Sequence, residues 1–160
     1  MKKLYICVLF LFIVGMISAQ DNDCAGYKSD NMYFRYTAYG CQEVVLGNHS
    51  KAINESRKMA NISAESELAK MVNSAVTRVA ERMTSEGDAY SEMYIDTTLV
   101  STYKYFHGMK TVYQSETKLN GNMYVTYITK EISMDKISDM FYFSSNEDKQ
   151  KFRKLLEKEK

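Results

Sequence analysis

The sequence predicts an α+β fold in which a small antiparallel sheet of about three strands packs against one long helix plus shorter helices. Between residues 50 and 83, apolar residues recur at steps of three and four, and neither Gly nor Pro interrupts them. This spacing gives an α-helix one apolar face. Two β-type segments, residues 110–119 and 122–132, flank the dipeptide Asn120–Gly121. That arrangement predicts a β-hairpin with a two-residue type I′ turn.

The N-terminus has the residue order of a secretory signal peptide. Lys2 and Lys3 precede a continuous apolar segment over residues 4–16, and small residues follow up to Ala19. We therefore expect cleavage after Ala19. The apolar segment is shorter than the roughly 20 residues that a spanning helix needs, so no transmembrane helix is expected in the mature chain. Cys24 follows polar residues instead of the apolar and small residues of a lipidation site, so no lipid anchor is expected.

The chain left after cleavage is long enough for one domain with its own core. We divide the sequence into a signal peptide (residues 1–19), an N-terminal tail (20–31), an α+β domain (32–142) and a charged C-terminal helix (143–160). The mature chain carries 19 basic and 20 acidic residues, or net −1 with His neutral. Because phosphate recognition depends on an excess of Lys and Arg, we expect no nucleic-acid partner.

Two cysteines remain after cleavage, Cys24 and Cys41. An even pair in an exported protein favours a disulfide, which would tie the N-terminal tail to the end of the first strand. The alternative is two unpaired thiols. No cysteine spacing typical of a zinc site is present in the sequence.

The first strand is predicted over residues 32–39, which are rich in aromatic side chains. Gly40 is expected to end it, and Gly47, Asn48 and Ser50 are expected to form the turn and the N-cap of the long helix. The strand residues expected to face the core are the alternate positions Met32, Phe34, Tyr36 and Ala38.

The long helix, predicted over residues 50–83, would span roughly 50 Å at about 1.5 Å per residue. Because a compact domain of this size is narrower than that, we expect the helix to overhang the body or to bend near Asn61 and Ser63. We expect Leu68, Val72, Val76 and Val79 to pack against the hairpin. The full apolar face is predicted to be Ala52, Ile53, Met59, Ala60, Ala64, Leu68, Met71, Val72, Ala75, Val76, Val79, Ala80 and Met83.

The remaining segments give weaker signals. Residues 89–106 fit both the alternation of a strand and the spacing of a helix, and the pattern does not choose between them. Residues 133–140 predict a short helix or turn. A capping-box pattern at Ser144 and Glu147 precedes a charged helix over residues 148–160. We expect that helix to dock through Phe152, Leu155 and Leu156.

The chain has matching positions at residues 33–40, Ala52, Ser56, Arg57, Glu67, Leu68, Ala69, Gly108, Thr111, Val112 and residues 124–127. Together with the order of the expected elements, these positions resemble the LPP-twenty lipoprotein family of bacterial envelope proteins. The resemblance covers residues 32–132 and implies a small sheet backed by helices, with residues 89–106 helical. It also implies an envelope location, in the periplasm or at the periplasmic face of the outer membrane. The family's lipobox is absent here, and the family supplies no catalytic residues.

No pattern in the sequence predicts an active site. The two histidines, His49 and His107, lie in no metal-ligand spacing, and there is neither a G-x-S-x-G motif nor a glycine cluster for phosphate. We expect the acidic pairs Glu65/Glu67 and Asp135/Asp139 to be solvated helix surface. The sequence therefore predicts a protein that is not an enzyme, without catalytic residues, metal or cofactor.

Thirteen tyrosines are the unusual feature of the composition. Because the strands carry Tyr on both faces, some rings should stay exposed, and exposed aromatic rings are enriched at protein interfaces. We expect an exported structural or interaction module that contacts other envelope proteins. The alternative is a periplasmic small-molecule carrier or enzyme with a pocket between the long helix and the sheet. The candidate interaction surface is Tyr33, Thr37, Tyr124 and Tyr127.

Overall fold

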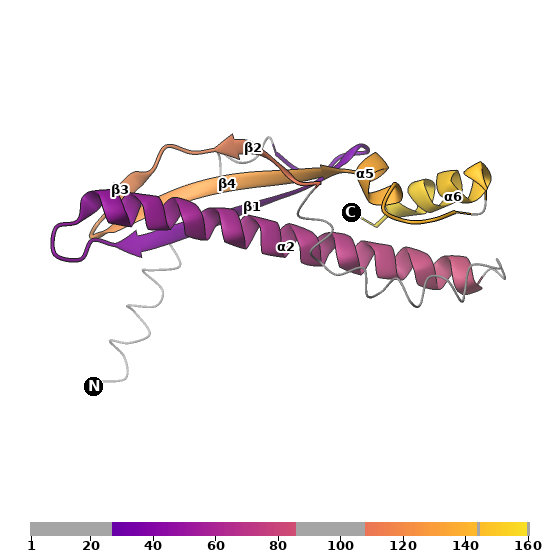
Figure 1. The fold of residues 1–160 in the computed structure, drawn as a ribbon, viewed down its shortest axis with the longest axis horizontal. Coiled ribbons are helices and arrows are strands. Elements are labelled where there is room, and N and C mark those ends of the chain that lie inside the picture. The colour runs from indigo at the N-terminus through magenta and orange to yellow at the C-terminus, as the bar shows by residue number, and fades with distance from the viewer. Residues whose placement is uncertain (1–26, 86–107, 144, 160) are drawn as a thin grey trace, which may run out of the picture.

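The computed structural model describes residues 27–85, 108–143 and 145–159. An antiparallel sheet packs against a long helix and shorter helices, as Figure 1 shows, which confirms the predicted α+β fold. The predictions for the signal peptide, Cys24, His107 and residues 89–106 lie outside the described residues. The elements are β1 (Tyr33–Glu43), α2 (His49–Ser85), β2 (Lys110–Gln114), β3 (Lys118–Asn120), β4 (Met123–Ser133), α5 (Met134–Ser138) and α6 (Asn146–Leu156).

β4 is the central strand of the sheet. β1 pairs with one side of it over its whole length, while β2 and β3 pair with its other side, all antiparallel. The single predicted strand over residues 110–119 is therefore two strands, and the register also shifts between Thr111 and Tyr113. Within the described residues, β1 has β4 on one side and no strand on the other, so it is an edge strand.

The hairpin turn lies one residue later than predicted. Asn120 pairs with Met123, so the two loop residues are Gly121 and Asn122. Gly121 has a φ of 62°, whereas Asn120 and Asn122 do not have positive φ. A positive φ at the first loop position alone is the type II′ pattern, so the predicted type I′ turn is wrong. Gly121, which adopts this φ without a steric penalty, sets the turn.

The first half of α2 lies very close to the sheet. A Cβ placed on Gly40 would lie only 2.1 Å from the Ser56 carbonyl oxygen and 2.3 Å from the Ala60 backbone nitrogen. Gly40 lies inside β1, so the prediction that it ends the strand is wrong; it allows the helix backbone to contact the strand. The helix positions buried here are all small: Ala52, Ser56, Ala60 and Ala64.

Three positions predicted to be in the core are exposed: Met32, Tyr36 and Met59. Met32 precedes the strand, which begins at Tyr33. Tyr36 lies on an edge strand, where the described chain places no further strand beside it. Met59 lies on the flank of α2, beside the small residues that form the contact. Of the predicted strand positions, Phe34 is buried and Ala38 is half-buried against Ala60, Ala64 and Ile128.

The main core surrounds the second half of α2. Leu68, Val72, Val76 and Val79 are buried there, and the predicted hairpin contributes Ile132 of β4 to this core. Their partners come from the start of β1, the end of β4, the helices α5 and α6, and the segment between these two helices. The partners are Phe34, Ile132, Met134, Ile137, Phe141, Phe152 and Leu156, together with Ala75 and Met83 of α2.

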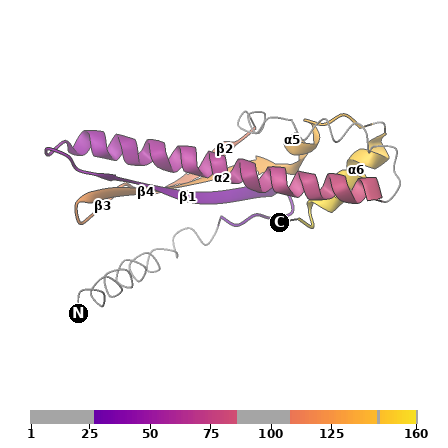
Figure 2. The same cartoon turned by 90° about the horizontal axis from the view of Figure 1, so that it is seen from below.

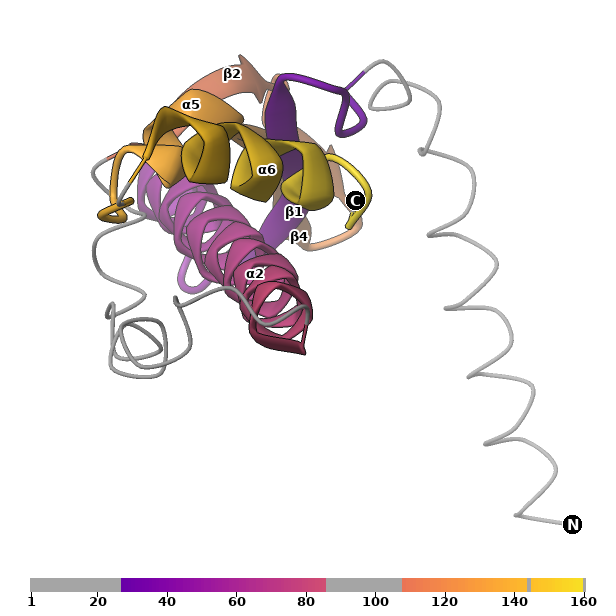
Figure 3. The same cartoon turned by 90° about the vertical axis from the view of Figure 1, so that its right-hand side faces the viewer.

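The part of α2 that extends beyond the sheet is covered by the shorter helices. Figure 2 shows the second half of α2 running past the end of the sheet, towards α5 and α6. Figure 3, viewed from that end, shows α6 in front of the sheet and next to α2. Phe152 and Leu156 of α6 belong to the core cluster, with Leu155 packed against it, so the predicted apolar seam is confirmed.

The cap of α6 is one residue later than predicted. The Asp148 backbone N–H donates to Ser145 Oγ (3.1 Å), so Ser145 is the N-cap in place of Ser144. At the start of α2, the Lys51 backbone N–H donates to Asn48 Oδ1 (3.0 Å), which makes Asn48 the cap of the long helix. None of the described helices combines the length and the apolar character needed to cross a membrane.

Candidate functional site

The outer face of the sheet, defined as the face turned away from α2, carries the odd-numbered residues of β1 and β4. α2 lies on the other face, where Ser56 Oγ and Thr126 Oγ1 share a hydrogen bond (2.9 Å). On the outer face, Thr37 Oγ1 and Thr129 Oγ1 are 2.7 Å apart, and the next row pairs the rings of Tyr39 and Tyr127 with centroids 6.1 Å apart. The outer face is therefore a ladder of hydroxyls and aromatic rings.

The structure brings together three of the four candidate interaction residues. Tyr33, Thr37 and Tyr127 lie on the outer face, because they occupy odd positions of β1 and β4. Tyr124 lies on the opposite face, where its hydroxyl is 3.2 Å from His49 Nδ1 at the start of α2. Period-two alternation separates Tyr124 from Tyr127. The candidate surface thus consists of the three outer-face residues.

Sequence reasoning missed the residue that exposes the largest aromatic surface here. Tyr39 lies on the outer face between Thr37 and Cys41, and 51% of its surface is exposed. Tyr39 is an even number of residues from Tyr33 along the strand, so alternation places both side chains on one face. This was the signal in the sequence that could have identified it. Cys41 is half-buried on the same face, while its predicted disulfide partner Cys24 lies outside the described residues.

Residues 27–31, here called the N-terminal strap, cross one end of the outer face. The Tyr27 ring stacks on the Tyr113 ring of β2 at a centroid distance of 5.0 Å. Two residues later, Ser29 Oγ lies at the edge of β1, where it accepts from the Arg35 backbone N–H (2.9 Å) and donates to the Arg35 carbonyl (3.3 Å). The strap therefore runs from β2 towards the outer edge of β1.

Arg35 anchors the strap electrostatically. Its guanidinium donates through Nε to Glu131 Oε2 (2.9 Å) and through Nη1 to Asp30 Oδ2 (2.5 Å), and it lies 5.0 Å from the centroid of the Tyr33 ring. Asp30 Oδ1 also accepts from the backbone N–H groups of Met32 (2.8 Å) and Tyr33 (2.9 Å). These donors, the Met32 N–H first, hold the pKa of Asp30 below its usual value against the opposing effect of desolvation.

The lowered pKa predicts that Asp30 contributes to stability above the ordinary pKa of an aspartate, and that this contribution is lost as pH falls through the lowered value. Asp30→Asn should therefore lower the Tm at neutral pH, and the difference from the native protein should shrink under acid. The effect should be small because about half of the Asp30 side chain is exposed. Thermal unfolding from neutral pH to pH ~2 checks this, and a difference that grows towards low pH would contradict it.

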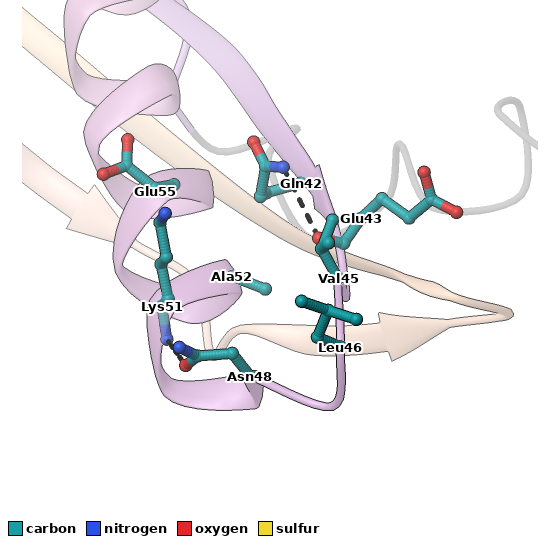
Figure 4. Close-up of a pocket in the computed structure, with 8 residues that line it drawn as sticks. All are labelled: Gln42, Glu43, Val45, Leu46, Asn48, Lys51, Ala52 and Glu55. Atoms are coloured by element: carbon teal, nitrogen blue, oxygen red, sulfur yellow. Dashed lines mark hydrogen bonds between the residues drawn. The ribbon is translucent and has the colours of Figure 1, made fainter.

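A cavity of about 610 Å³ lies between the end of β1 and the start of α2. Figure 4 shows its lining: Gln42 and Glu43 come from the strand, Lys51 and Glu55 from the helix, and the loop closes one end. In that loop the Asn48 N–H donates to the Val45 carbonyl (3.1 Å). The cavity is open to solvent, and its lining combines charged and amide side chains with the apolar Val45, Leu46 and Ala52.

The loop beside the cavity has an unusual conformation. Leu46 and Gly47 have φ values of 53° and 71°, the type I′ pattern in which Asn, Asp or Gly is usual at the first position. Leu46 is the one described non-glycine residue with positive φ, and its side chain is fully exposed. A left-handed conformation costs a leucine roughly 1–2 kcal/mol.

The acidic pairs considered from sequence are engaged in ion pairs. Glu65 accepts from the buried Lys130 ammonium (2.8 Å), and Glu67 accepts from Lys70 (2.6 Å). Asp139 pairs with Lys149 (2.6 Å), and Asp135 pairs with Arg153. Across the described residues, no group of His, Cys, Asp and Glu has the geometry to hold a metal ion.

Comparison with known proteins adds no further information on the site. No protein-family model and no curated protein matches the chain.

Proposed function

We propose that this protein is an exported, non-enzymatic module of the bacterial cell envelope that works by contact with other envelope proteins. The signal-peptide pattern supports export, and the resemblance to the LPP-twenty family supports a place in the periplasm or at the periplasmic face of the outer membrane. The observation that carries the interaction role is the outer face of the sheet. It presents the half-exposed ring of Tyr39 beside Thr37, and no described helix lies over it.

Site-specific photocrosslinking tests the interaction role. A benzophenone amino acid replaces Tyr39 in the protein expressed in its own cell envelope, and a second protein carries it in place of Tyr142. Tyr142 is a matched control because it is a tyrosine that is 73% exposed but lies beyond α5, away from the outer face. We expect a discrete crosslinked partner from position 39 and none from position 142. Equal or absent crosslinking at both positions would contradict the proposed interaction surface.

The proposal also predicts a mature protein that begins at Gln20 and carries no lipid. Intact mass spectrometry of the exported protein measures this directly, because cleavage after Ala19 removes a defined mass. An added diacylglycerol mass at Cys24, or retention of residues 1–19, would contradict the prediction. The same measurement, made before and after reduction and alkylation, determines whether Cys24 and Cys41 form a disulfide.

The cavity between β1 and α2 supports a second candidate function, a carrier of a small polar molecule. Its volume of about 610 Å³ is within the range of ligand sites, and Lys51 and Glu55 offer opposite charges to a zwitterionic ligand. Thermal shift with amino acids and small polyols tests it. A stabilisation that Lys51→Ala and Glu55→Ala both remove would favour the carrier. If none of these probes shifts the Tm, a carrier function for amino acids and small polyols is excluded.

A further inference from the structure

The direction of the backbone groups along β1 can be read from the strap and from Ser115, which follows β2 and bonds to β4. In an antiparallel strand, the N–H and C=O of one residue point to the same side, and successive residues alternate. The Arg35 N–H and C=O both bond Ser29, and the Tyr33 carbonyl accepts from the Asp30 N–H (3.0 Å). The odd-numbered residues of β1 therefore point their backbone groups away from β4.

The other side of β4 gives the same result independently. The Tyr127 carbonyl accepts from the Ser115 backbone N–H, and the Tyr127 N–H donates to Ser115 Oγ, both at 2.9 Å. Tyr127 is opposite Tyr39 in the register. Its backbone groups nevertheless point away from β1, so they do not bond to Tyr39. The register of β1 is continuous from Tyr33 to Glu43, so Thr37, Tyr39 and Cys41 all direct their N–H and C=O outward.

Those six backbone groups form a free edge. No described residue bonds to the outward N–H or C=O of Thr37, Tyr39 or Cys41. Proteins usually protect such an edge with a charged side chain, a proline or a bulge. Residues 36–42 contain no charged residue, the chain has no proline, and β1 has no bulge. The strap covers the edge only as far as Arg35.

Apolar side chains flank this edge on its helix side. Met59 lies beside β1, since its Cβ is 2.9 Å from the position of a Cβ on Gly40. Ile62 follows three residues later on the same flank of α2, and these two side chains are 44% and 54% exposed. Arg57, on the opposite flank, reaches Thr117 beside β3 (3.0 Å). Exposed Tyr36 completes the apolar flank of the β1 edge.

We propose that the β1 edge at residues 37–41 binds an extended, apolar segment of a partner polypeptide by strand addition. The proposal rests on the proposed interaction function and names the chemistry of the partner. Backbone N–H and C=O groups alternating along a strand are complementary to the backbone of another strand. The side chains that the segment turns towards α2 would pack on Met59 and Ile62, which selects for apolar residues at alternate positions.

Two other occupants fit less well. The described residues of the strap lead away from the edge, because they run from Ser29 at β1 to Tyr27 at β2. A second copy paired through β1 would place two strands about 4.8 Å apart. The α2 backbone, however, packs directly on Gly40, and two helices need roughly 8–10 Å between their axes. A single strand without its own covering helix avoids this clash.

Amide hydrogen exchange followed by NMR tests the proposal on the mature protein. The probe is a short synthetic peptide of alternating Val and Thr with terminal lysines, and its control is the same peptide with N-methylated backbone nitrogens. We expect the first peptide alone to slow exchange at Thr37, Tyr39 and Cys41. Absence of slowing, or equal effects of both peptides, would overturn the proposal. Slowing at these amides that rises with protein concentration without peptide would assign the edge to a second copy, and would also overturn it.

A pair of substitutions separates the backbone of Tyr39 from its ring. Tyr39→Pro removes one outward donor and leaves the β4-facing groups of Ala38 and Gly40, a placement that edge strands tolerate. It should weaken peptide binding about tenfold. Tyr39→Val also removes the ring but keeps the N–H, so it should bind the peptide more tightly than Tyr39→Pro does. Equal binding by all three would overturn strand addition, and the exchange experiment on the native chain does not depend on how the proline variant folds.

The photocrosslinking at position 39 keeps the two proposals apart. If a partner is captured there while the edge amides remain unprotected by peptide, strand addition fails and the interaction function stands. If nothing is captured specifically at position 39, the interaction function itself fails.

Discussion

Leu68→Ala should lower the free energy of unfolding by about 2–5 kcal/mol, as expected when a buried leucine is truncated and its cavity persists. Leu68 is fully buried in the core cluster. It lies where α2 passes from the sheet to the helices α5 and α6. The core cluster that contains Leu68 has members from β1, β4, α5 and α6, so movement of one element alone should not close the cavity. Urea unfolding of the two proteins measures the loss as a lower midpoint at unchanged slope.

Glu67→Ala and Lys70→Ala are the matched controls, because both lie in the same turns of α2 but on its solvent side. Their ion pair (2.6 Å) is exposed, and each substitution should change stability by less than about 0.5 kcal/mol. If Leu68→Ala also left the isolated protein unchanged but weakened partner binding, the core would form only on binding. That outcome would contradict a self-contained domain.

The parts of the fold that could be predicted are those that depend on local periodicity. The apolar spacing of residues 50–83 requires a helix, and α2 occupies residues His49–Ser85. The alternation of residues 122–132 requires a strand, and β4 occupies Met123–Ser133. In each case a continuous apolar stripe can be buried in only one type of element.

The parts that could not be predicted depend on contacts between distant residues. Gly40 has the local signature of a strand end, yet its role is set by Ser56 and Ala60, which come from a different element. The hairpin shows the same limit, because the turn type follows from the pairing of Asn120 with Met123. The dipeptide composition alone favours a turn one residue earlier.

Only part of the candidate surface could be predicted from the sequence. Strand alternation places Tyr33, Thr37 and Tyr127 on one face once the register of β1 and β4 is known. The small residues of α2 decide which face of the sheet the helix covers: Ala52, Ser56, Ala60 and Ala64. The hydrophobicity pattern of the strands does not show this. The free edge of β1 depends in turn on strand order, and a sequence pattern does not specify which strand is at the edge.

Gly40→Ala should destabilise the protein by about 3 kcal/mol, the upper end of the range for overpacking. The added Cβ would lie 2.1 Å from the Ser56 carbonyl oxygen and 2.3 Å from the Ala60 nitrogen. Both are backbone atoms of α2, so no side-chain rotation can relieve the contact. The first half of the helix must move away from β1, which also separates the Ser56 and Thr126 hydroxyls that now share a hydrogen bond (2.9 Å).

Gly47→Ala is the control for the effect of replacing a glycine where no close contact is made. Its φ is 71°, and no atom lies within 4 Å of an added Cβ, so it should cost only the left-handed conformation, about 1 kcal/mol. Urea unfolding compares the two variants, and hydrogen exchange of the amides of residues 52–64 locates the change. If Gly40→Ala cost no more than Gly47→Ala, α2 would be free to shift along the sheet, and the close contact at Gly40 would not fix its position.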